Sequence, residues 1–81
     1  MNIYLLSQSI NIADDSYDSC IVRAESEEEA KQINPDGSDN DIRLERWSIW
    51  VNDVDNVDCT LIGIAIEGST KGLVLASFNA G

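Results

Sequence analysis

Short apolar runs alternate with polar stretches along the chain, and they predict four main strands. Residues 3–7 and 20–24 read as the first two strands, joined as a long hairpin across a polar, acidic connection. In residues 57–66, the side chains that would point to either face of a strand are largely apolar. This pattern favours a central strand covered on both faces or a strand sharing one face with a partner. Residues 73–78 read as a last strand, antiparallel to the preceding one across a glycine-containing loop.

One short helix is predicted between the second and third strands. Ser26 followed by Glu29 matches a capping box, in which Ser26 accepts from the Glu29 amide and Glu29 reaches back to the Ser26 amide. Glu27 and Lys31 have the spacing of a favourable ion pair. Asn34 precedes a proline and is expected to end the helix. About two turns of helix would not hold alone and must pack on a sheet.

Residues 42–54 are ambiguous between strand and helix. Ile42 and Leu44 alternate as in a strand, whereas Trp47, Trp50 and Val51 fall at helical spacing. We favour an extended segment through Trp50, followed by a single turn near residues 52–55. The whole chain, residues 1–81, is then one α+β domain. Its small antiparallel sheet has four to five strands, with one short helix packed on a face, in the order β-β-α-β-β with an optional fifth strand.

Composition narrows the chemistry. The 81 residues include 15 acidic and 5 basic side chains and no histidine, giving a formal net charge of −10. Such a charge repels nucleic acid and anionic membranes. The absence of histidine removes the usual general base and nitrogen metal ligand. No nucleophile stands in a recognisable motif with a base, so we expect a binding protein rather than an enzyme.

No cofactor or metal site is expected. Residues 36–47 place oxygen ligands at alternate positions, but Asp41 and Trp47 stand where a calcium loop needs glycine and glutamate. Cys20 and Cys59 cannot complete a zinc site in one chain. The favoured interpretation is two reduced, mostly buried thiols in a cytoplasmic protein, and a disulfide joining two strands is the alternative.

The charge is unevenly distributed, since residues 1–41 carry ten acids and two bases. If the hairpin leads into the helix, these acids could share one edge and imitate the phosphates of nucleic acid. The alternative is that they only confer solubility. The candidate partner-binding acids are Asp14, Asp15, Asp18, Glu27, Glu28, Asp36, Asp39 and Asp41.

Two further features concern binding. Trp47 and Trp50 lie beside arginines and are candidate anchors for a partner, although at least one tryptophan of so small a core is expected to be structural. The last strand, from Leu73 to Phe78, has no charge. It is therefore either interior to the sheet or an edge that pairs with a second copy in a homodimer.

Several segments resemble short phage and prophage proteins. The resemblance lies in the start Asn-Ile-Tyr-Leu-Leu-Ser-Gln, the stretch from Tyr17 to Ala30, the run Leu-Ile-Gly-Ile-Ala and the ending Ala-Ser-Phe-Asn-Ala-Gly. The first 35 or so residues also resemble, more loosely, small anti-CRISPR proteins, some of which begin with a similar Met-Asn-x-Tyr-Leu strand. That resemblance implies a protein that blocks a bacterial defence complex by binding it.

Taken with the acidic charge, these resemblances imply a phage-derived inhibitor in the host cytosol. Its acidic face would dock on the basic nucleic-acid-binding surface of a host defence protein, without touching nucleic acid or membrane itself. One alternative is a homo-oligomeric phage accessory or structural protein. Another is a dimeric sponge for a signalling nucleotide, which would require Arg23, Arg43 and Arg46 to gather at one site.

Overall fold

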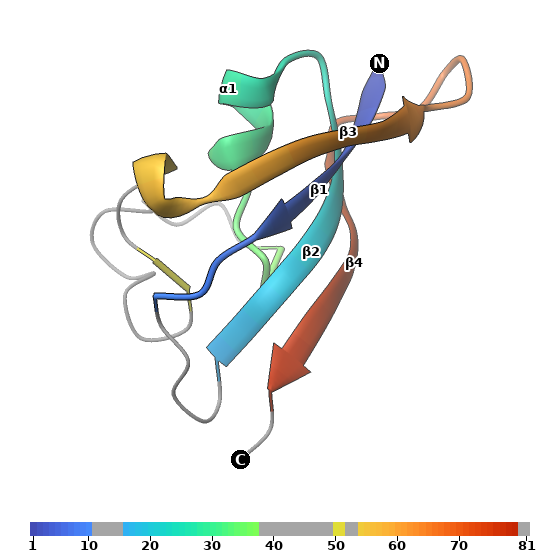
Figure 1. The fold of residues 1–81 in the computed structure, drawn as a ribbon. Coiled ribbons are helices and arrows are strands. Elements are labelled where there is room, and N and C mark those ends of the chain that lie inside the picture. The colour runs from blue at the N-terminus through green and yellow to red at the C-terminus, as the bar shows by residue number, and fades with distance from the viewer. Residues whose placement is uncertain (11–15, 38–49, 52–53, 80–81) are drawn as a thin grey trace.

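A computed structural model of the chain describes residues 1–10, 16–37, 50–51 and 54–79 (Figure 1). Within these ranges the elements follow the predicted order and confirm a small α+β fold. They are β1 (Asn2–Ser7), β2 (Ser16–Ala24), α1 (Glu27–Lys31), the 3₁₀ turn η2 (Val54–Asn56), β3 (Asp58–Ile64) and β4 (Gly72–Asn79).

The strands form one antiparallel sheet in the order β3-β1-β2-β4. β1 and β2 pair from Asn2 opposite Ala24 to Ser7 opposite Ser19, which confirms the predicted hairpin. β2 begins at Ser16, earlier than predicted, because its polar first residues pair with the end of β4. At the loop end of this hairpin, the Gln8 side chain donates to the Tyr17 carbonyl at 2.8 Å.

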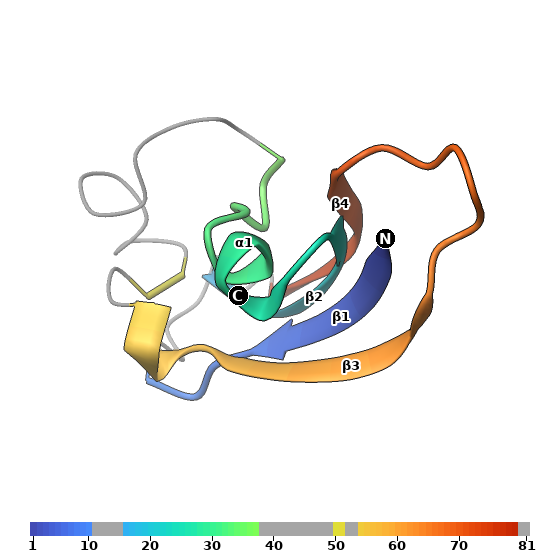
Figure 2. The same cartoon turned by 90° about the horizontal axis from the view of Figure 1, so that it is seen from above.

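The two strands in the second half of the sequence lie at opposite edges of the sheet, which corrects two predictions. β3 pairs with β1, and β4 pairs with β2, so β3 is not a central strand and does not form a hairpin with β4. Residues 65–71 join the two strands around one end of the curved sheet (Figure 2). Seven residues reach roughly 25 Å, enough to cross the three interstrand spacings of about 5 Å each.

β3 also departs from simple alternation. A bulge shifts its register against β1 between Ile3 and Tyr4, where Gly63 and Leu61 are the partners, and Ile62 is the extra residue. Leu61 and Ile62 are both exposed. The two-sided apolar pattern of this strand therefore reflects exposure at an edge, not burial on both faces.

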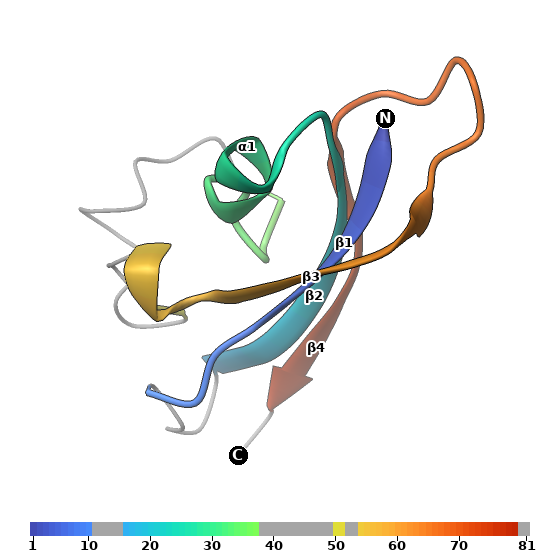
Figure 3. The same ribbon diagram turned by 45° about the horizontal axis from the view of Figure 1, so that its top comes forward.

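The core lies between the sheet and α1, which packs on the concave face (Figures 2 and 3). The strands contribute every second residue to it, as their pleat requires. The buried hydrophobic residues are Tyr4, Leu6, Cys20, Val22, Ala24, Ala30, Trp50, Val51 and Val57. Of the ambiguous segment, residues 42–49 and 52–53 lie outside the described residues, whereas the turn predicted near its end is present as η2.

The start of α1 is capped as predicted on one side only. The Glu29 amide donates to Ser26 Oγ at 3.2 Å, but the Glu29 carboxylate accepts from the Glu25 amide at 3.1 Å instead of the Ser26 amide. The Glu27–Lys31 pair is present at 3.6 Å. The helix ends at Lys31, before the predicted Asn34.

Neither cysteine is in a disulfide, and Cys20 is buried while Cys59 is half-buried. Each is the register partner of Leu6, from opposite sides of β1. They are therefore separated by two strand spacings, about 10 Å, whereas a disulfide needs Cα atoms within about 7 Å. The fold therefore excludes the alternative of a bridge between these strands.

Candidate interaction surfaces

The structure places four of the predicted acidic residues on the surface. Asp18 is exposed near the start of β2, Glu27 and Glu28 are exposed in the first turn of α1, and Asp36 is exposed after the helix. The other candidates fall outside the described residues: Asp14, Asp15, Asp39, Asp41 and Trp47.

These four acids do not share one edge. Asp18 and the Glu27–Glu28 pair lie toward opposite ends of β2, and the strand from Asp18 to Ala24 alone spans about 20 Å (Figure 1). Next to Asp36, Gly37 takes a left-handed φ of 79° and lies against the Leu73 side chain of β4. Asp36 therefore sits toward the β4 side of the helix, away from β3.

A different acidic group forms where α1 packs against β3. Asp55 in η2 and Asp58 at the start of β3 are both exposed, and the helix bearing Glu27 and Glu28 contacts the same strand. We refer to Glu27, Glu28, Asp55 and Asp58 as the acidic rim. Asp55 and Asp58 are not among the partner-binding acids predicted from the sequence, because nothing in the pattern says which strand a capped helix covers.

The pKa of the Cys59 thiol depends on burial and on the charges of α1 beside it. Burial raises the pKa of its thiol, and the negative charge of Glu27 raises that pKa further. The positive charge of Lys31 lowers the same pKa and so opposes both effects. Burial and the Glu27 charge thus both favour the protonated thiol over the thiolate, which is the nucleophilic form.

Both sheet edges expose apolar side chains. On the β3 side, Leu61, Ile62, Ile64 and Ile66 are exposed, with Ile64 and Ile66 reaching 78% and 83%. On the β4 side, Val74, Leu75 and Phe78 are exposed. So many exposed large apolar residues in so small a protein indicate contact surfaces. The sequence pattern could not distinguish these exposed apolar residues from core residues, because both occur at alternating positions of apolar strands.

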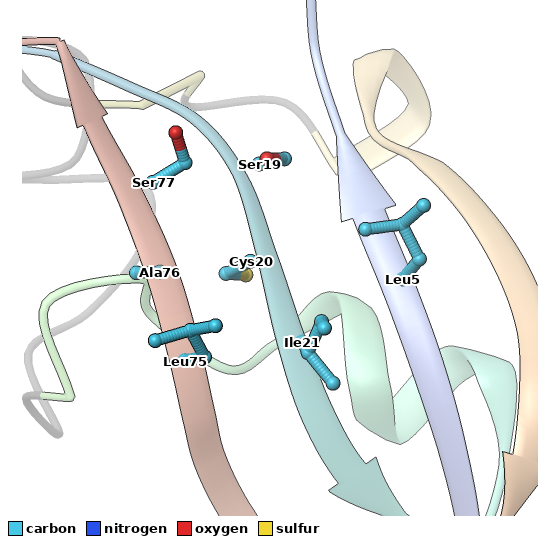
Figure 4. Close-up of a pocket in the computed structure, with 7 residues that line it drawn as sticks. All are labelled: Leu5, Ser19, Cys20, Ile21, Leu75, Ala76 and Ser77. Atoms are coloured by element: carbon cyan, nitrogen blue, oxygen red, sulfur yellow. The ribbon is translucent and has the colours of Figure 1, made fainter.

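The sheet face opposite α1 carries an apolar row across three strands. Leu5 pairs with Ile21, and Ile21 pairs with Leu75. These side chains line a shallow depression of about 270 Å³ together with Ser19 and Ser77 (Figure 4). No lining residue is charged, so the depression suits an apolar group.

Trp50 is fully buried in the core. A ring without exposed surface cannot anchor a partner, so its predicted role as a contact residue is wrong. Burial of this large side chain instead fits the expectation that one tryptophan is structural.

The remaining candidate chemistries find little support in the described ranges. Arg23 donates to the Thr70 carbonyl at 2.8 Å and so ties β2 to the loop before β4, while Arg43 and Arg46 lie outside the described residues. In residues 1–10, 16–37, 50–51 and 54–79, no group of three His, Cys, Asp or Glu side chains is placed to hold a metal ion.

In those same parts of the chain, no helix has the length and apolar character needed to cross a membrane. Comparison of the sequence and the fold with protein-family models, with curated proteins and with solved structures found no match.

Proposed function

We propose that this chain is a protein-binding inhibitor of phage origin that covers a basic nucleic-acid-binding surface of a bacterial defence protein. The observation that carries the proposal is the acidic rim. Glu27 and Glu28 stand on α1, which packs on β3, while Asp58 begins β3 and Asp55 lies in the turn just before it, so acids from two distant segments flank the contact between α1 and β3.

The physical basis is electrostatic complementarity. A basic groove that evolved to bind phosphates attracts a surface with closely spaced carboxylates, and the net charge of −10 accelerates the encounter. Exposed apolar side chains at the sheet edges supply the dehydrated contact area that charge alone does not.

A plating assay tests the proposal. The chain is expressed in bacteria that carry an active CRISPR or restriction system, and the plating of a targeted phage is measured. Expression should raise plating, and Glu28→Lys should reduce that gain on the order of tenfold, the equivalent of about 1.4 kcal/mol of binding.

Asp36→Lys is the matched control, because it also replaces an exposed acid with lysine, but on the β4 side of the helix, away from the rim. Equal effects of the two reversals would mean that total charge matters and the rim does not. No gain in plating across a panel of defence systems would reject the inhibitor itself.

A second candidate function is a homo-oligomeric accessory or structural protein. The observation that favours it is β4, an uncharged strand whose only partner within the described sheet is β2 and whose Val74, Leu75 and Phe78 are exposed. Two acidic copies can meet there without bringing carboxylates together, since residues 72–79 contain none.

Light scattering after size-exclusion chromatography measures this directly. If β4 joins two copies, the mass is that of a dimer, and Leu75→Lys gives a monomer, because the lysines of the two copies would meet at the contact. Ile66→Lys, an equally drastic change on the β3 side, should leave the dimer intact. A mass of one chain at every concentration would eliminate this candidate.

A further inference from the structure

The outer edge of β3 has the properties of a docking site for another strand. Within the described sheet β3 pairs only with β1, so the backbone groups on its other side have no strand partner. Ala65 continues the ladder beyond the strand, its amide donating to the Met1 carbonyl at 2.8 Å. Because successive amides of an extended chain point in opposite directions, the Ile64 N–H points to the outer edge.

This edge lacks the features by which proteins normally prevent unwanted strand pairing. Residues 59–66 contain no charged residue and no proline, and Leu61, Ile62, Ile64 and Ile66 are exposed along them. Exposed apolar edges promote aggregation and are usually blunted by lysine, proline or a cover. Among the described residues, the bulge at Ile62 is the one protective device at this edge, and it leaves residues 63–66 on its far side as a continuous stretch.

The charges at the two ends of the β3 edge indicate which kind of segment pairs with it. Asp58 is exposed at the start of β3, and Glu67 is exposed just beyond Ile66, so the apolar stretch has an acid at each end. A second copy paired antiparallel on this edge would bring Asp58 of one chain near Glu67 of the other, and directly opposed like charges destabilise a pair. A segment with basic residues at both ends would instead place opposite charges together.

We propose that the outer edge of β3 binds an extended segment of a partner protein, with a β-branched apolar centre and lysine or arginine at both ends. The segment adds to the sheet as a fifth strand, its backbone bonding to outward groups such as the Ile64 N–H. The distance from Asp58 to Glu67 corresponds to about 30 Å of extended chain, or about ten partner residues. This inference goes beyond the proposed inhibition and does not depend on it.

A peptide titration tests the proposal without any defence protein. The probe is a capped peptide with a Thr-Val-Thr-Val-Thr-Val centre and two lysines at each end, added at low salt to the isotope-labelled full chain. The largest amide shifts should fall on residues 63–66, and exchange of the Ile64 amide should slow. The same peptide with glutamates in place of the lysines should bind at least about tenfold more weakly.

Two variants separate backbone pairing from apolar contact. Ile64→Pro removes an outward N–H while leaving the ladder to β1, a position at which edge strands tolerate proline. It should weaken peptide binding at least about tenfold, whereas Ile64→Thr keeps the N–H and should stay within about threefold.

Amide spectra of each variant without peptide establish that it is folded, and the comparison of the two peptides needs no variant at all. The proposal is overturned if the peptides bind equally, if the shifts map to β4 or the open face, or if Ile64→Pro binds like the original chain. It is also overturned if Ile64→Pro converts a dimer to a monomer, because the occupant would then be a second copy.

Discussion

At the scale of single residues, the start of α1 shows how much depends on one hydroxyl. Ser26 Oγ accepts from the Glu29 amide and so satisfies one of the amides that a helix start leaves without an intrahelical partner. The helix has five residues, too few to be stable without tertiary contacts. Its buried Ala30 packs against the sheet, so loss of the cap weakens the attachment of the acidic rim.

Ser26→Ala should lower the free energy of unfolding by about 1 kcal/mol, because the Glu29 amide loses its acceptor. Urea unfolding followed by tryptophan fluorescence measures this change, since Trp50 is buried in the core. Ser26→Asn keeps a capping oxygen and should retain most of the stability. If alanine and asparagine cost the same, the hydroxyl does not act as a cap.

At the scale of elements, the sequence pattern predicted the features that depend on neighbouring residues, and it did not predict which distant strands pair. The β1–β2 hairpin, the cap of α1 and the existence of β3 and β4 follow from runs, turns and spacing over a few residues. The sheet order does not, because β3 and β4 find their partners far along the chain, at the two free sides of the hairpin. The side-chain pattern of each strand fits a central or an edge position in the sheet, and only the strand pairing decides between the two positions.

The same limit applied to the candidate site. The predicted acids were grouped by closeness in sequence, which placed Asp18 with Glu27, whereas the fold puts the length of β2 between them. Asp55 and Asp58 join the rim through packing of α1 on β3, a contact between segments more than twenty residues apart. Residue type and exposure were therefore predictable, but the shape of the acidic surface was not.

At the scale of the whole molecule, a net charge of −10 destabilises the small folded state through repulsion between like charges. Dissolved salt screens this repulsion. Mutual repulsion of carboxylates is stronger in the folded state, where they are closer together. Raising sodium chloride from about 10 mM to about 0.3 M shortens the Debye length from roughly 30 Å to below 8 Å. The melting temperature measured by circular dichroism should therefore rise.

The effect should shrink as the pH approaches the sequence pI of about 4.1, where the net charge disappears. A melting temperature that falls with added salt at neutral pH would show that attractive pairs such as Glu27–Lys31 outweigh the repulsion.

The strand order also sets the sequence of events by which the chain acquires its structure. Ser7 pairs with Ser19 across 19 − 7 = 12 positions, and with Asp58 across 58 − 7 = 51 positions. Closing the longer loop costs about 1.3 kcal/mol more in chain entropy. We therefore expect the central hairpin to form before β3 attaches, and both of its sides to lack strand partners until residues 58–79 have left the ribosome. We expect chaperones to affect the yield of this protein mainly in that interval.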